Sequence, residues 1–132
     1  MPFIRITLAQ TVALPQQQAL ARRATGLIAA ILHKRAEVTA VQVACAGQDA
    51  WCIAGEPVSA ALTPAHAELF ITEGTNTQAE KAEMIVALHR LLGEICGALP
   101  EASYIVIHEV PAANWGYGGL TQAARQQARQ GL

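Results

Sequence analysis

Residues 67–110 read AELFITEGTNTQAEKAEMIVALHRLLGEICGALPEASYIVIHEV and contain two candidate strands separated by one candidate helix. Residues 68–72 and 104–110 are rich in apolar and β-branched side chains, which favour strands. A capping box, Thr77-Gln78-Ala79-Glu80, begins the helix, and the glycine and proline at 97 and 100 end it. Apolar residues at intervals of three and four predict one buried helix face: Met84, Leu88, Leu91, Leu92 and Ile95. The stretch therefore predicts a β-α-β unit.

A similar unit lies 64 residues earlier in the chain. Residues 3–8 and 39–45 predict strands, and residues 14–35 predict a helix with Pro15 in its first turn. Corresponding apolar and aromatic residues share this offset: Leu20 with Met84, Leu27 with Leu91, Ile28 with Leu92, Ile31 with Ile95, Val41 with Ile105, and Trp51 with Trp115. The chain is therefore a tandem β-α-β repeat.

This repeat predicts an α+β fold in a single domain over residues 1–132. Two units, at about 2–55 and 65–120, are followed by a short C-terminal segment at 121–132, and the Gly-rich residues 111–119 predict a short hairpin. A crossover helix usually joins parallel strands, so the expected sheet is four-stranded and mixed, with two helices on one face. The other face needs a cover, and we expect oligomerisation to supply it.

The composition argues against several classes of protein. The net charge of about −1 creates no basic field for nucleic acid or an anionic membrane, and no apolar segment predicts a membrane span. Three cysteines without CxxC spacing predict neither disulfides nor a zinc site, and no histidine pattern predicts another metal. With no signal peptide in the sequence, we expect free thiols in a reducing cytoplasm.

Short motifs in a fixed order resemble the tautomerase superfamily. Residues 67–119 are similar to the small 4-oxalocrotonate tautomerases, with strand-Glu-Gly, a helix, strand-Glu and an aromatic-Gly-x-Gly-Gly ending. Over its full length the chain resembles the macrophage migration inhibitory factor branch, through MPFI at the start, Lys34, Glu56-Pro57, Tyr104-Ile105 and Ala112-Ala113-Asn114. The resemblance implies a tautomerase-like fold, a homotrimer and no cofactor.

The resemblance also gives Pro2 a role that its position in the chain does not require. Taken alone, Pro2 begins a strand, where its missing N–H is tolerated. Once Met1 is removed, however, Pro2 carries a secondary amine, and an α-amino group titrates near ~7.7–8.0. Burial or a nearby cation lowers that pKa towards the value that suits proton transfer at neutral pH. The resemblance implies that Pro2 is the general base.

Four further residues are candidates for substrate binding. The resemblance implies that Lys34 binds a carboxylate, that Tyr104 reaches the site from a neighbouring subunit, and that Trp115 forms an apolar wall. Each also has a structural alternative, as a helix C-terminal cation, a strand aromatic or a packed loop residue. Strand alternation places Gln42 on the same face as His108, as a weak polar candidate. His108 itself is expected to be structural.

Departures from the sequence patterns of the two branches narrow the range of substrates that we expect. Thr75 and Gln42 occupy the positions where the 4-oxalocrotonate branch has arginines, which makes a dicarboxylate a poor fit. The expected function is a cofactor-free tautomerase, an isomerase acting on an α-keto acid or its enol, with a monocarboxylate or aryl-type keto acid favoured. The alternative is a trimeric binding protein that keeps the fold without this turnover.

Overall fold

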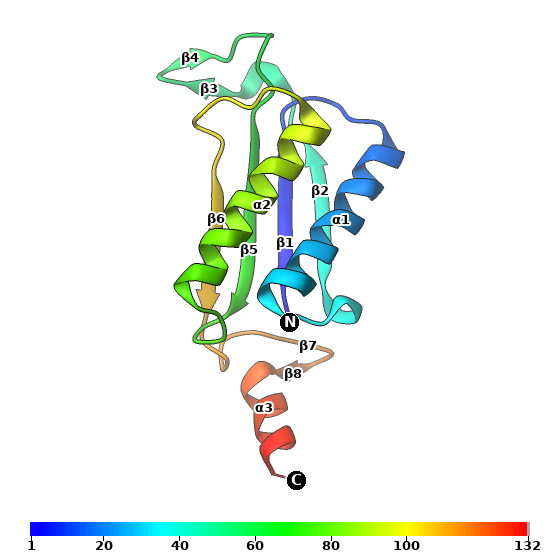
Figure 1. The fold of residues 1–132 in the computed structure, drawn as a ribbon, viewed down its shortest axis with the longest axis vertical. Coiled ribbons are helices and arrows are strands. Elements are labelled where there is room, and N and C mark those ends of the chain that lie inside the picture. Colours follow the sequence, from blue (N-terminus) through cyan, green and yellow to red (C-terminus); the bar gives the residue numbers. More distant parts are fainter. Residues whose placement is uncertain (132) are drawn as a thin grey trace.

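A computed structural model describes residues 1–131 (Figure 1). Four strands form the main sheet in the order β2-β1-β5-β6: β1 (Phe3–Leu8), β2 (Ala40–Cys45), β5 (Ala65–Thr72) and β6 (Ile105–Val110). β1 is parallel to β2, β5 is parallel to β6, and the central pair β1 and β5 is antiparallel. The predicted mixed sheet of four strands is confirmed.

Both long helices, α1 (Leu14–Leu32) and α2 (Gln78–Cys96), cover one face of this sheet (Figure 1). Alternate residues of β1 and β5 point at the helices and are fully buried, and they include Ile4, Ile6, Leu69 and Ile71. The apolar helix stripes meet them in one core, which contains Leu20, Ala24, Ile28, Met84, Leu88, Leu91 and Leu92. Burial of these matched stripes explains why the two units share a single core.

The ends of α1 and α2 follow from local hydrogen bonding. Thr77 and Glu80 form the predicted capping box, since each side chain accepts a hydrogen bond from the other residue's backbone N–H. The prediction that α1 continues to residue 35 is wrong. His33 has a left-handed backbone (φ 60°), and the amide of Asn76 donates to the carbonyl of Leu32, which ends the helix there.

The remaining elements lie at the two ends of the sheet (Figure 1). One end carries a small hairpin of β3 (Cys52–Ile53) and β4 (Glu56–Pro57). The other end, near the N-terminus, carries the hairpin of β7 (Gly116–Tyr117) and β8 (Leu120–Thr121), followed by α3 (Gln122–Gln130). Short 3₁₀ turns lie at Ala36–Val38 and Gln48–Ala50.

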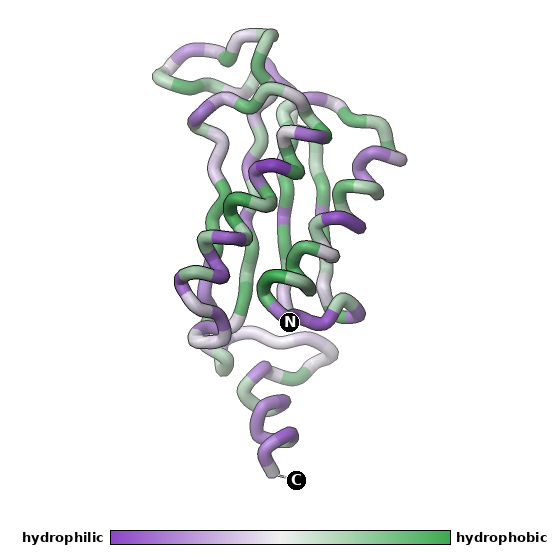
Figure 2. The backbone as a smooth tube through the Cα atoms, viewed as in Figure 1, coloured by the Kyte–Doolittle hydropathy of each residue, from purple (hydrophilic) through white to green (hydrophobic). Residues whose placement is uncertain are grey.

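The opposite face of the sheet carries no helix within the described chain (Figure 1). Figure 2 shows hydrophilic positions alternating with hydrophobic ones along the strands, and a largely hydrophilic α3. Within residues 1–131, no helix has the length and apolar character required to cross a lipid bilayer.

Candidate active site

A cavity of about 460 Å³ opens at the start of β1 and includes Met1 and Pro2 in its lining. Its walls are largely aromatic, with Phe3 from β1, Phe70 from β5, and Trp115 and Tyr117 from the C-terminal hairpin. A hollow of similar volume lies between α1 and α2, but it is crossed by the exposed ion pair of Arg23 and Glu94 and lies away from Pro2. The cavity beside Pro2 is therefore the candidate active site.

Pro2 is fully buried, and the strand ladder holds its backbone. Its carbonyl accepts a hydrogen bond from the N–H of Ala40 over 3.3 Å, which continues the pairing of β1 with β2. Here Met1 precedes Pro2, so the Pro2 nitrogen is an amide and the amine is one residue away. Burial, then the positive charges of Lys34, Arg129 and Arg35, lower the pKa of that terminal amine from 8.0 to about 6. The surroundings therefore favour a neutral amine.

The C-terminal hairpin places Trp115 and Tyr117 in the cavity wall. Gly118 and Gly119 both have positive φ, of 60° and 80°, as a tight two-residue turn between paired strands requires. Gly116 has no room for a side chain, since a Cβ there would lie 1.9 Å from the carbonyl oxygen of Leu120. The Gly-rich motif is therefore explained by the hairpin geometry.

Contacts outside the hairpin fix its two aromatic side chains. The indole N–H of Trp115 donates a hydrogen bond to the hydroxyl of Thr72 over 3.1 Å. The backbone carbonyl of Trp115 accepts a hydrogen bond from the N–H of Gln122. The guanidinium of Arg125 lies 3.8 Å from the ring centre of Tyr117 and donates to the carbonyl of the same residue. The start of α3 therefore holds the wall against the end of β5.

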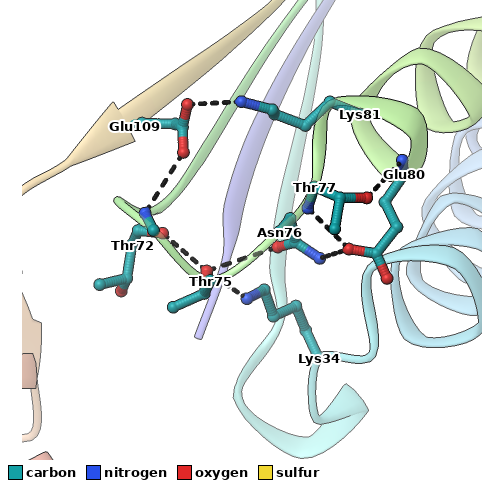
Figure 3. Close-up of polar contacts among 9 residues, drawn as sticks. Lys34, Thr72, Thr75, Asn76, Thr77, Glu80, Lys81 and Glu109 are labelled. Atoms are coloured by element: carbon teal, nitrogen blue, oxygen red, sulfur yellow. Dashed lines mark hydrogen bonds and ion pairs between the residues drawn. The ribbon is translucent and has the colours of Figure 1, made fainter.

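Lys34 lies beside the terminal amine without lining the cavity. Its ammonium donates to the hydroxyl of Thr75 over 2.7 Å, and that hydroxyl donates to the carbonyl of Thr72 (Figure 3). Burial lowers the pKa of Lys34, and the charge of Glu80 opposes the shift. Thr75, which stands where an arginine was expected, thus anchors a cation near the amine.

A second pair of charges clamps the loop between β5 and α2. Glu109 of β6 accepts hydrogen bonds from Lys81 at 2.6 Å and from the N–H of Gly74 at 3.4 Å (Figure 3). The bond from Lys81 lowers the pKa of Glu109 below its usual value. Glu109 therefore ties β6 to α2 close to the residues that hold Lys34.

Arg5 also lines the cavity, although no motif in the sequence indicates it. It follows Phe3 by two residues, so both side chains lie on the face of β1 opposite the helices. Period-two alternation from Phe3 could have placed Arg5 on this face, but the closure of the cavity by the distant hairpin could not be foreseen. Its guanidinium lies 3.5 Å from Glu68, whose other oxygen bonds His108 over 3.1 Å.

His108 stacks on Phe70, with ring centres 4.5 Å apart. Two other predicted site residues lie outside the cavity of this chain. Tyr104 is 65% exposed at the far end of β6, because β6 is parallel to β5 and starts near the end of β1. Gln42 is exposed and pairs with Arg5 across the ladder without lining the cavity.

Among residues 1–131, no group of three or more His, Cys, Asp or Glu side chains could hold a metal.

Comparison with known proteins finds a family match over part of the chain. A family model described as Tautomerase enzyme matches residues 67–125, from β5 into α3. The second half of the chain, over residues 67–125, is therefore similar to tautomerase enzymes. The matched segment includes the loop around Thr75 and the hairpin next to Trp115.

Solved structures share the fold of this chain over almost its full length. The F6 fused 4-OT asymmetric trimer has a TM-score of 0.81 at 20% identity, covering 93% of this chain and 98% of the other. The macrophage migration inhibitory factor-like protein of Entamoeba histolytica has a TM-score of 0.76 at 19% identity, covering 91% and 97%. The macrophage migration inhibitory factor of Toxoplasma gondii gives 0.76 at 19%, covering 90% and 98%. At these identities the likeness establishes the fold; no curated protein matches the sequence.

Proposed function

We propose that this protein is a cofactor-free keto–enol tautomerase, an isomerase that acts on an α-keto acid or its enol. Pro2 is the general base after Met1 is removed. The observation that carries the proposal is the position of Pro2, buried just before β1 in an aromatic-lined cavity, where burial and nearby cations lower the pKa of the adjacent Met1 amine from 8.0 to about 6. An amine in this range is largely neutral at pH 7 and can accept a proton.

The reaction moves one proton. In the ketonising direction, the Pro2 amine takes the proton from the enol hydroxyl, the carbonyl forms, and the protonated Pro2 amine returns that proton to the carbon of the former double bond. The aromatic walls exclude water from the amine and favour its neutral form. Thr75 and Gln42 supply no positive charge at the positions where two arginines were expected. A monocarboxylate with an aryl or similarly apolar tail therefore suits the cavity better than a dicarboxylate.

The proposed assembly is a homotrimer. The 4-OT neighbours include one described as a symmetric trimer and others described as asymmetric trimers. Tyr104 lies at the opposite end of the sheet from Pro2, so a Tyr104 that contacts substrate must come from a neighbouring copy. The helix-free face of the sheet provides the surface for such an interface. Sedimentation equilibrium of the purified chain should give three times the monomer mass.

We further place the protein in the cytoplasm, since all three of its cysteines are free and Cys45 and Cys52 are exposed. A reducing compartment keeps such thiols unpaired. Fractionation of cells expressing the untagged chain should recover it with cytoplasmic markers.

The decisive experiment combines mass spectrometry with kinetics. The intact mass should show loss of Met1, and the enzyme should ketonise phenylenolpyruvate faster than 2-hydroxymuconate. Pro2→Ala should lose about 10²- to 10⁴-fold in kcat/KM, as expected when a general base is removed. Pro15→Ala, at the exposed start of α1, is the matched control and should keep the parental rate. Retained Met1, or equal rates in Pro2→Ala and the parent, would leave the non-catalytic binding protein as the better description.

A further inference from the structure

We infer that Arg5 binds the carboxylate of the substrate. This deepens the proposed function, because it assigns the anion-binding group of the same cavity. Arg5 is the charged side chain that lines the cavity, whereas the nearby Lys34 is engaged by Thr75 outside the lining. The cation that meets a ligand here therefore comes from β1.

The guanidinium has donors to spare for such a ligand. Its nearest carboxylate, Glu68, lies 3.5 Å from one terminal nitrogen, and the Arg5 side chain is 50% exposed. A guanidinium carries five N–H donors in a planar fork that suits a carboxylate. A single ion pair of this length leaves most of those donors available on the cavity side.

Neighbouring side chains hold Arg5 in place. Glu68 is fixed by His108, which stacks on Phe70, and Phe70 in turn lies 5.9 Å from Phe3. The guanidinium also lies 5.8 Å from the centre of the Phe3 ring. Two of the aromatic walls and the cation are thus parts of one packed layer on the helix-free face of the sheet.

The spacing of Arg5 and Pro2 suits a small keto acid. Three residues along a strand separate their Cα atoms by roughly 10 Å. Both line one cavity, so a ligand seated between them directs its carboxylate to Arg5 and its enolisable carbon towards the amine. The apolar tail then lies against Trp115 and Tyr117.

Binding measurements test this without requiring turnover. The probes are 3-phenylpropionate, an unreactive aryl carboxylate, and its neutral amide, 3-phenylpropionamide. Arg5→Gln should weaken 3-phenylpropionate binding by roughly 10- to 100-fold, the loss expected for a charge-assisted hydrogen bond. It should leave binding of the amide unchanged, and Arg5→Lys should recover part of the affinity.

Arg22→Gln is the matched control, since Arg22 is an exposed arginine on α1 away from this cavity. It should bind both probes as the parent does. Circular dichroism and thermal melting of each variant identify any loss of fold, and Arg5→Lys keeps the test valid if Arg5→Gln unfolds. An equal loss for acid and amide would contradict the inference.

The outcomes separate this inference from the proposed function. If the parent turns over phenylenolpyruvate but Arg5→Gln and Arg5→Lys bind 3-phenylpropionate as tightly as the parent, the role of Arg5 is wrong and the tautomerase stands. If the carboxylate-selective loss appears without any turnover, the anion site stands and the enzymatic proposal fails. If the parent does not bind 3-phenylpropionate, the inference is overturned.

Discussion

The indole nitrogen of Trp115 donates a hydrogen bond to the hydroxyl of Thr72, and the two atoms lie 3.1 Å apart. Trp115 belongs to the loop that enters the C-terminal hairpin, and Thr72 is the last residue of β5. The bond therefore joins the cavity wall to the central sheet.

Thr72→Val should loosen this wall while keeping the shape of the buried side chain. The variant leaves the indole N–H without its acceptor, which costs about 1–3 kcal/mol when the group stays buried. We expect a lower melting temperature and a shifted Trp115 emission, measured in a Trp51→Phe background so that one indole reports. An unchanged emission spectrum would show that Thr72 does not position the ring.

Gly116→Ala should disrupt the hairpin. Its new Cβ would meet the carbonyl of Leu120 at 1.9 Å, so β7 and β8 must separate. Displacement of Trp115 and Tyr117 should lower kcat/KM on the order of 10- to 100-fold. Gly26→Ala is the control, because α1 has open space there and alanine favours helices; if both variants lose activity alike, hairpin geometry is not the cause.

Lys34→Gln should shift the pH dependence of catalysis. Burial and then Lys34 lower the pKa of the terminal amine to about 6, and the Pro2 amine is expected to experience the same surroundings. A general base works deprotonated, so kcat/KM rises as the pH passes upward through that pKa and then levels. Removal of the positive charge should raise the pKa and move the rising limb to higher pH. A limb at the same pH in Lys34→Gln and Arg22→Gln would contradict the electrostatic role.

Glu109→Gln should change how stability depends on pH. Lys81 lowers the pKa of Glu109 in the folded chain, so this carboxylate stabilises the fold above its unfolded pKa, near ~4.3. That contribution disappears as the pH falls through the lowered folded value. At pH 7 the variant should be less stable by up to about 1 kcal/mol, because the pair is partly exposed. In urea unfolding at pH 7 and pH 3, the difference from the parent should shrink at the lower pH; a constant difference would exclude Glu109 as its source.

Much of this architecture is encoded locally. Thr77 and Glu80 form their capping box within one turn, and the stripe from Met84 to Leu92 faces the core as its spacing predicts. The end of α1 was less predictable, because it depends on Asn76, which is 44 residues away from Leu32 in the chain.

The candidate site likewise has some features that the local sequence predicts and others that depend on tertiary contacts. The sequence by itself determined that Pro2 immediately precedes a strand and that Trp115 lies at the entrance to a Gly-rich hairpin, since both follow from the chemistry of neighbouring residues. Only the tertiary structure decided that Arg5 shares their cavity, that Lys34 is held by Thr75, and that Tyr104 lies at the opposite end. These relationships depend on strand direction and on contacts between segments far apart in the chain, which local periodicity does not specify.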